Sequence, residues 1–336
     1  MFIIRFLLIT TLFILTSCTK NCIDNDVAFE EINPNIKFEH LEKDLFSEQI
    51  NALSKHNYLL NKYGSLYVLF YAQMLNEGDP YNEKAPTILN NYINHSSTQE
   101  IYKETTTEFE NFDSYENSIT KAFKYFNYYF PDSSLPIITT YYSNFNANVI
   151  ETNSRIAIGI EMYLGTENNV VKNLSPDYFP LFIKEKMKSD FLVTDVMHCF
   201  LHNRFYSSLG DDFISKIIAL GKIMYLIEVM TPSLDENLKF RYSKDELAWC
   251  KNNEMNIWKL IVNGNLLYSK DKKEINPFIS ESPFTKGLPQ ESPSKVGVWL
   301  GYKIVKDYVE ANCVDVLDLH LEKNVRKILK SYKPNE

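Results

Sequence analysis

Hydrophobic side chains recur at helical spacing through most of this chain. The clearest case is the segment Asp190–Phe205, whose apolar residues follow an i, i+3, i+4, i+7, i+8 pattern that forms one stripe on a helix: Val193, Val196, Met197, Phe200 and Leu201. The same period predicts ten further helices: Ser47–Asn61, Leu66–Leu75, Ala85–Asn94, Ser97–Phe109, Asp113–Phe130, Pro180–Lys188, Asp211–Met230, Lys244–Asn263, Ser292–Asn312 and Val314–Tyr332.

Strand-like patterns are confined to a few segments. Ile36–Phe46 alternates weakly and is expected to be a strand that runs into a helix. Three runs of β-branched and aromatic residues predict sheet strands: Pro136–Tyr142, Ala147–Thr152 and Arg155–Tyr163. Ile275–Pro289 contains three prolines and a glycine and is expected to be a loop. The chain is therefore predicted to be α+β, mostly helical with a small sheet, with residues 34–336 forming a single domain or two lobes.

The Asp190–Phe205 helix carries a histidine pair. His198 and His202 are four residues apart and share a face, which is the geometry of the zinc-binding H-E-x-x-H helix. Cys199 occupies the glutamate position, so the general base of a zinc peptidase is missing. The pair lies opposite the apolar stripe, beside Asp195. We expect a polar helix face, in which His198 and His202 are only weak metal candidates, and we expect no catalytic residue and no cofactor.

The N-terminus predicts a lipid anchor. Arg5 precedes an apolar run that is too short to span a bilayer, and the run ends in Leu15-Thr16-Ser17-Cys18. This pattern is typical of a bacterial lipoprotein signal peptide, which is cleaved before a cysteine that then receives acyl chains. We therefore expect a signal peptide at 1–17, lipidation of Cys18, a polar tether at 18–33, and a lipid-anchored location in the cell envelope, facing the periplasm.

Charge and cysteine spacing exclude some functions. Lysines and arginines number 35 against 43 acidic residues, giving a net charge of −8, and no basic stripe is visible, so nucleic acid is not an expected partner. Four further cysteines are too scattered for a C-x-x-C metal site: Cys22, Cys199, Cys250 and Cys313. They allow three full disulfide pairings, among which the sequence does not decide.

Two glycines lie one turn apart in the predicted helix Ser292–Asn312, which Ser292 is expected to cap. Each glycine lowers helix stability by about 1 kcal/mol relative to alanine. Close packing of another backbone against this face would offset that loss. We therefore predict a buried face with Gly301 in direct backbone contact, made by Gly297, Gly301, Ile304, Val305 and Tyr308.

Several blocks, in this order, together resemble the GldB family of gliding motility lipoproteins. They are Leu15–Cys18, Ile158–Gly165, Gly221–Leu226, Tyr242–Trp249, Trp258, Leu266–Ser269, Pro283–Lys286 and Glu291–Val305. The resemblance covers most of the chain after about Ile156, while the first half adds little beyond Cys18 and the residues before it.

This resemblance implies a membrane-anchored envelope protein needed for gliding over surfaces, in a machinery linked with secretion of surface adhesins. The family also resembles, distantly, the H-E-x-x-H zinc peptidases, which implies a zincin-like, degenerate peptidase architecture. Such peptidases take a third ligand, often a glutamate, from the next helix. That position falls at Leu220, and Glu228 is the only acid of that helix after Asp212.

Three functional hypotheses follow. The leading one is a non-catalytic lipoprotein that acts through contacts with other envelope proteins of the gliding apparatus. The alternative is an envelope zinc metallopeptidase that uses His198, His202 and either Glu228 or Cys199. A third is a periplasmic protein that binds a small ligand or a glycan through a tyrosine-rich surface.

Anchoring is directly testable. Cys18→Ala removes the thiol that would accept the diacylglycerol, so the variant is expected to remain as uncleaved precursor or as soluble protein. Metabolic labelling with a fatty acid measures this, with the unchanged chain as control. Label retained on the Cys18→Ala variant would contradict the lipoprotein interpretation.

Overall fold

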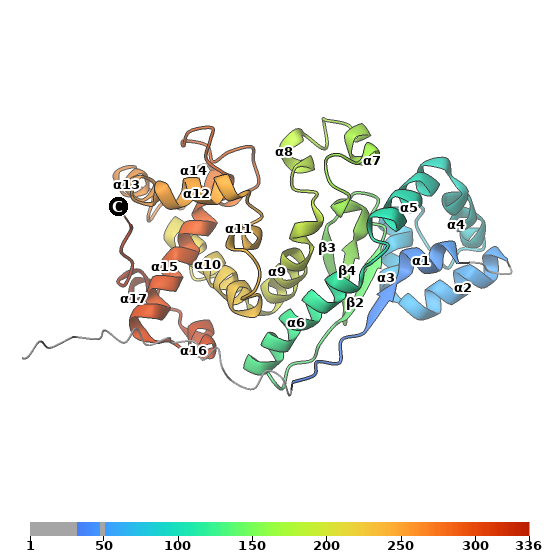
Figure 1. The fold of residues 1–336 in the computed structure, drawn as a ribbon, viewed down its shortest axis with the longest axis horizontal. Coiled ribbons are helices and arrows are strands. Elements are labelled where there is room, and N and C mark those ends of the chain that lie inside the picture. Colours follow the sequence, from blue (N-terminus) through green and yellow to red (C-terminus); the bar gives the residue numbers. More distant parts are fainter. Residues whose placement is uncertain (1–31, 48–50, 336) are drawn as a thin grey trace, which may run out of the picture.

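The computed structural model describes residues 32–47 and 51–335. The predicted signal peptide, Cys18 and nearly all of the tether lie outside the described residues. The fold is α+β, as predicted, with helices on both sides of one small sheet (Figure 1). The helices of the first half are α1 Leu41–Phe46, α2 Ala52–Tyr63, α3 Ser65–Leu69 with the π-helical turn Phe70–Met74, α4 Ala85–Asn94, α5 Ser96–Glu108 and α6 Asp113–Tyr129.

The regular elements of the chain after β4 (Arg155–Gly159) are all helices in the described residues. The α-helices among them are α7 Asn169–Asn173, α8 Leu181–Lys184, α9 Leu192–Phe205, α10 Phe213–Met230, α11 Glu236–Lys239, α12 Lys244–Asn252, α13 Glu254–Asn263, α14 Lys272–Ile279, α15 Val296–Asn312, α16 Val316–Leu321 and α17 Val325–Leu329. No helix in the described part of the chain is both long and apolar enough to cross a membrane.

The sheet has four strands in the order β1-β2-β4-β3, with bounds β1 Phe38–His40, β2 Ile137–Tyr141, β3 Val149–Thr152 and β4 Arg155–Gly159. β1, β2 and β4 run parallel, and β3 pairs antiparallel with β4 at one edge. Ile138 and Ile156 face each other across the buried centre of the sheet. The expected strand that runs into a helix at Ile36–Phe46 is confirmed as β1 and α1.

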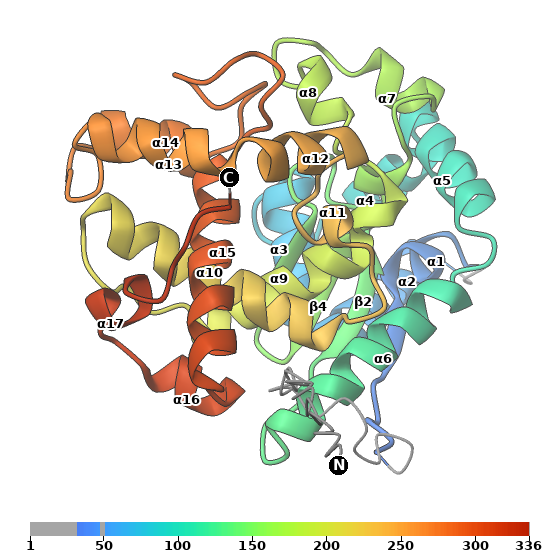
Figure 2. The same ribbon diagram turned by 60° about the vertical axis from the view of Figure 1, so that its left-hand side comes forward.

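Helices α9, α10 and α15 form successive layers on one side of the sheet. α9 contacts β3 and β4, α10 packs on α9, and α15 packs on α10 (Figures 1 and 2). The predicted apolar stripe of α9 is buried, and Phe200 meets Phe123 and Phe126 of α6 edge-on at ring centroid distances of 4.8 and 4.7 Å. Seven tyrosines are among the largest fully buried side chains, so much of the tyrosine content forms core: Tyr63, Tyr67, Tyr71, Tyr141, Tyr142, Tyr163 and Tyr302.

The predicted close contact at Gly301 is confirmed. A Cβ added to Gly301 would lie 1.9 Å from the carbonyl oxygen of Ile217 on α10. Reciprocally, a Cβ on Gly221 would lie 2.2 Å from the carbonyl carbon of Gly301. The two helices therefore cross with their backbones touching, and the rest of the glycine face is buried with them. Lys303 and Asp307 lie partly exposed, as expected for the outer side.

Some predicted boundaries were wrong, for local reasons. α2 is capped by Asn51 and not by Ser47. The side-chain oxygen of Asn51 accepts a hydrogen bond from the Ser54 N–H. The third predicted strand ends at Gly159 and continues as a 3₁₀ turn, Ile160–Tyr163. The predicted helix over 180–188 is only the single turn α8, and the one over 244–263 breaks at Asn253, whose side-chain amide donates to the Trp249 carbonyl.

The C-terminal third holds three further corrections. The expected loop 275–289 includes most of α14, which accommodates Pro277. α15 begins at Val296 and not near Ser292, because the Ser292 hydroxyl donates to the Pro289 carbonyl. The single helix expected over 314–332 is two, because Asn324 caps a new start at α17. In the last two cases a side chain bonds to nearby backbone, which competes with helix continuation.

Gly301→Ala is expected to destabilise the protein, typically by about 1–3 kcal/mol, because the added methyl group meets backbone that cannot move aside. Chemical or thermal unfolding measures the change. Ala311→Leu, at an exposed position on the same helix, adds a larger group and should stay within about 0.5 kcal/mol of the original. A higher melting temperature for Gly301→Ala would contradict the close crossing, since alanine stabilises an open helix position.

Candidate functional site

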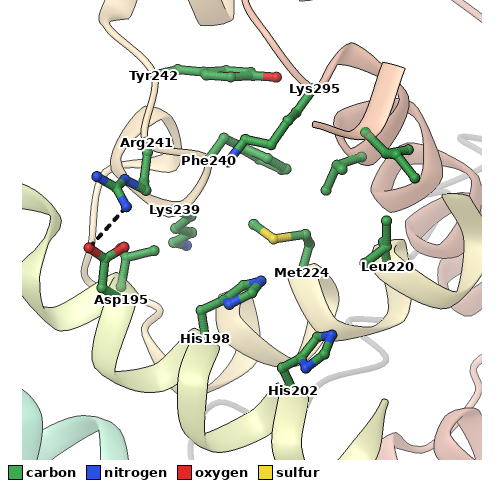
Figure 3. A pocket seen from close by; sticks show the side chains of 13 residues that line it. Asp195, His198, His202, Leu220, Met224, Lys239, Phe240, Arg241, Tyr242 and Lys295 are labelled. Carbon is green, nitrogen blue, oxygen red and sulfur yellow. Dashed lines mark ion pairs between the residues drawn. The ribbon is translucent and has the colours of Figure 1, made fainter. Parts of the chain in front are cut away.

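The histidine pair of α9 lines a pocket of about 250 Å³ between α9, α10, α11 and the start of α15. The rings of His198 and His202 stack at a centroid distance of 5.6 Å, and His202 stacks in turn on Tyr206 at 4.6 Å. Figure 3 shows both rings at one wall of the pocket, with Leu220 and Met224 of α10 on the adjoining wall. The polar face expected on α9 therefore borders a concave site.

Asp195 lies one turn before His198 on the same face and is almost fully buried. Its Oδ2 accepts a hydrogen bond of 2.8 Å from the Tyr163 hydroxyl and forms an ion pair of 3.1 Å with Nη1 of Arg241 (Figure 3). Burial raises the pKa of Asp195, and the guanidinium of Arg241 opposes that rise. Because Arg241 stays protonated in proteins and its own pKa is raised by Asp195, the pair is best described as charged.

Arg241 is fixed by backbone as well as by charge. Its Nη2 donates to the Lys186 carbonyl at 2.8 Å, and its own backbone adopts the left-handed region with φ of 57°. Non-glycine residues rarely adopt this conformation, which costs of order 1 kcal/mol or more and persists where surrounding contacts hold it. The contacts made by Arg241 supply that constraint, and they place its Nε in the buried part of the site.

The opposite wall is built by the segment that leads into α15. Lys295 occupies the N-cap of α15 with φ of 55°, lines the pocket, and forms an ion pair with Glu281. Tyr242 donates its hydroxyl hydrogen to the Ser294 carbonyl at 2.7 Å, which ties the chain after α11 to this segment. The pocket therefore depends on contacts between two stretches about 50 residues apart in sequence.

His198 is held in its neutral form. Burial within the surrounding protein, followed by the positive charges of Lys295, His202 and Arg241, lowers its pKa to about 4. The His198 side chain is nevertheless exposed to solvent at the pocket. The positive charges beside it lower its pKa in the same direction without burial. At neutral pH the imidazole can donate one hydrogen bond and accept another.

The other proposed metal ligands do not join the histidines. Glu228 lies farther along α10, where it contacts the Tyr302 hydroxyl and pairs with Lys306 at 2.9 Å. Cys199 does not line the pocket; it is 3.8 Å from the Asn203 side-chain nitrogen, and burial raises its thiol pKa to about 11. Cys199 and Cys250 are both free thiols.

Within residues 32–47 and 51–335, no group of three or more His, Cys, Asp or Glu side chains is placed to hold a metal ion. Leu220, at the position where the resemblance places a third ligand, does line the pocket beside the histidines. An aliphatic side chain cannot coordinate a metal. The chemistry that these side chains offer includes hydrogen bonding and charge pairing.

Several pocket residues were missed from the sequence. They are Lys239, Phe240, Arg241, Tyr242 and Lys295. Two of them fall inside blocks that carry the family resemblance, since Tyr242 begins one block and Lys295 lies within another. The unusual residues in these blocks could have marked them as parts of a site. Nothing in the sequence, however, indicated that the two blocks lie beside the α9 histidines.

Comparison with known protein families matches residues 22–334 to the family described as gliding motility protein GldB. No curated protein and no solved structure gives a significant match to the chain. The family match covers nearly the whole described domain, including α9, α10, α15 and every residue of the pocket. The chain therefore belongs to the family of the gliding motility protein GldB.

Proposed function

We propose that this chain is a non-catalytic, lipid-anchored protein of the cell envelope that takes part in gliding motility through contacts with other proteins. Membership of the GldB family implies involvement in gliding motility and association with the membrane as a lipoprotein. The non-catalytic role, the periplasmic side and the protein partners are the parts that we propose.

The observation that carries the non-catalytic role is the composition of the α9–α10 wall. Two histidines share the pocket with Leu220 and Met224, while Glu228 is engaged by Lys306 and Cys199 lies elsewhere. A metallopeptidase needs three protein ligands and a base for the attacking water. Losing a general base typically lowers the rate by a factor of about 10²–10⁴. The α9 helix therefore has the histidine spacing of a zinc peptidase without the third ligand and the base, which supports a non-catalytic role.

Deletion of the gene is expected to abolish colony spreading and the movement of single cells on glass. Both should return when the unchanged gene is supplied in trans, which controls for effects on neighbouring genes. Time-lapse microscopy of single cells gives the measurement. Normal movement in the deletion strain would contradict a role in gliding, whatever the pocket binds.

The alternative is an envelope zinc metallopeptidase, which the spacing of His198 and His202 favours. Metal content separates the two functions. We expect the lipidated chain, purified in detergent without chelator, to hold far less than one zinc ion per chain. The His198→Ala/His202→Ala double variant should have the same zinc content. Lys259→Met, at an exposed position on α13, serves as the matched control. One zinc per chain, lost in the double variant alone, would favour the peptidase and contradict the non-catalytic role.

A further inference from the structure

An unpaired lysine lies in the pocket. Lys239 ends α11, is only 7 % exposed, and lines the cavity beside His198 (Figure 3). Within the described part of the chain its ammonium group makes no ion pair and no hydrogen bond to the protein. An isolated buried ammonium group is costly, so buried charges are nearly always paired. The expected response of such a group is a lowered pKa, and burial lowers that of Lys239.

The other charges around the cavity are already balanced. Arg241 is paired with Asp195, and Lys295 is paired with Glu281. Glu228, the acid whose charge acts most strongly on Lys239, is held by Lys306 at 2.9 Å. Asp235 and Glu236 also act on Lys239 through their charge, but neither forms an ion pair or a hydrogen bond with it. The Lys239 ammonium group is thus left without a direct counter-ion, within a chain whose net charge is −8. A ligand with a single negative charge would neutralise it, whereas a phosphate dianion would leave an excess of negative charge.

Hydrogen-bond donors for such an anion are present. Arg241 contributes charge but no free donor, because Asp195 and the Lys186 carbonyl engage its terminal nitrogens and its Nε is buried out of reach of a ligand. The imidazole of His198, at the same wall, can donate a hydrogen bond whether or not it is protonated. A carboxylate has two oxygens and about four acceptor positions, which suits an ammonium group and one imidazole N–H.

The remaining wall is apolar. It is formed by side chains of α10, α11, α14 and α15: Leu220, Met224, Phe240, Ile279 and Val298. A pocket of about 250 Å³ is small for a drug-sized ligand, for which about 300–1,000 Å³ is usual. It has room for one branched aliphatic group next to the charged end.

We propose that this pocket binds a monocarboxylate that carries a short apolar group, with Lys239 as the main anchor of the carboxylate. Two sources share this chemistry: a free small acid, and the C-terminal residue of a polypeptide. The proposal concerns ligand recognition and does not depend on the role in gliding.

Calorimetric titration of N-acetyl-leucine into the lipidated chain in nonionic detergent tests this, with titration into detergent alone subtracted. N-acetyl-leucinamide has the same apolar group without the charge. We expect the acid to bind at least about tenfold more tightly than the amide, because hydrogen bonds to charged groups contribute more than neutral ones. Equal binding of both compounds, or no binding of the acid, would overturn the proposal.

Lys239→Met keeps most of the aliphatic stem and removes the charge, so it should fold and should lose the preference for the acid. Lys239→Gln gives a polar, uncharged version of the same test if the methionine variant folds poorly. Lys259→Met removes an exposed lysine of α13 and should bind the acid as the unchanged chain does. An acid preference that survives in either folded Lys239 variant would refute the assignment of the anchor.

Chelator separates this site from a metal site. Binding of N-acetyl-leucine should be unchanged by EDTA, and binding that requires added zinc would overturn the proposal. The source is then resolved with a hexapeptide that ends in leucine and its C-terminal amide. Binding of the free-carboxylate peptide alone identifies a polypeptide C-terminus, whereas exclusion of both peptides, with N-acetyl-leucine still bound, identifies a free small acid.

Discussion

The backbone contact between α10 and α15 fixes the geometry on which the candidate site depends. Gly221 and Gly301 remove both side chains at the crossing, so that the carbonyl groups of one helix touch the other. The dispersion attraction of many close atom pairs then offsets the loss of helix stability, which is about 1 kcal/mol at each glycine relative to alanine. Because α10 also packs on α9, this crossing sets the distance between the histidine pair and the start of α15.

The walls of the pocket combine a rigid apolar frame with polar groups held under constraint. Arg241 and Lys295, on opposite walls, both have left-handed backbone, and each is fixed by an ion pair. A buried ion pair is weak evidence for stability, because the loss of hydration largely cancels the attraction. Its clearer effect here is positional: Asp195 and Glu281 fix the side chains of Arg241 and Lys295 at the pocket.

The sequence was informative where one local pattern decided the structure. The periodicity of α9, the bounds of α4 and the buried glycine face of α15 follow from spacing alone, and the structure agrees. It was uninformative where tertiary contacts decide. Lys239 belongs to a helix of four residues, too short to show a period, and its place is set by contacts such as that between Tyr242 and Ser294. The histidines could be recognised as a pair, but not the cations that accompany them.

The pocket is assembled from a limited part of the chain. Among the described residues, its lining begins at Thr194 and ends at Val298, and the support for Asp195 reaches back only to Tyr163. The helices α1–α5 therefore contribute to the domain without shaping the site. Substitutions can accumulate in them at little cost to the pocket, provided that the sheet stays covered. Sequence divergence among relatives should accordingly be fastest in α1–α5, so that distant relatives are recognised through their second half, where the resemblance of this chain to its family was concentrated.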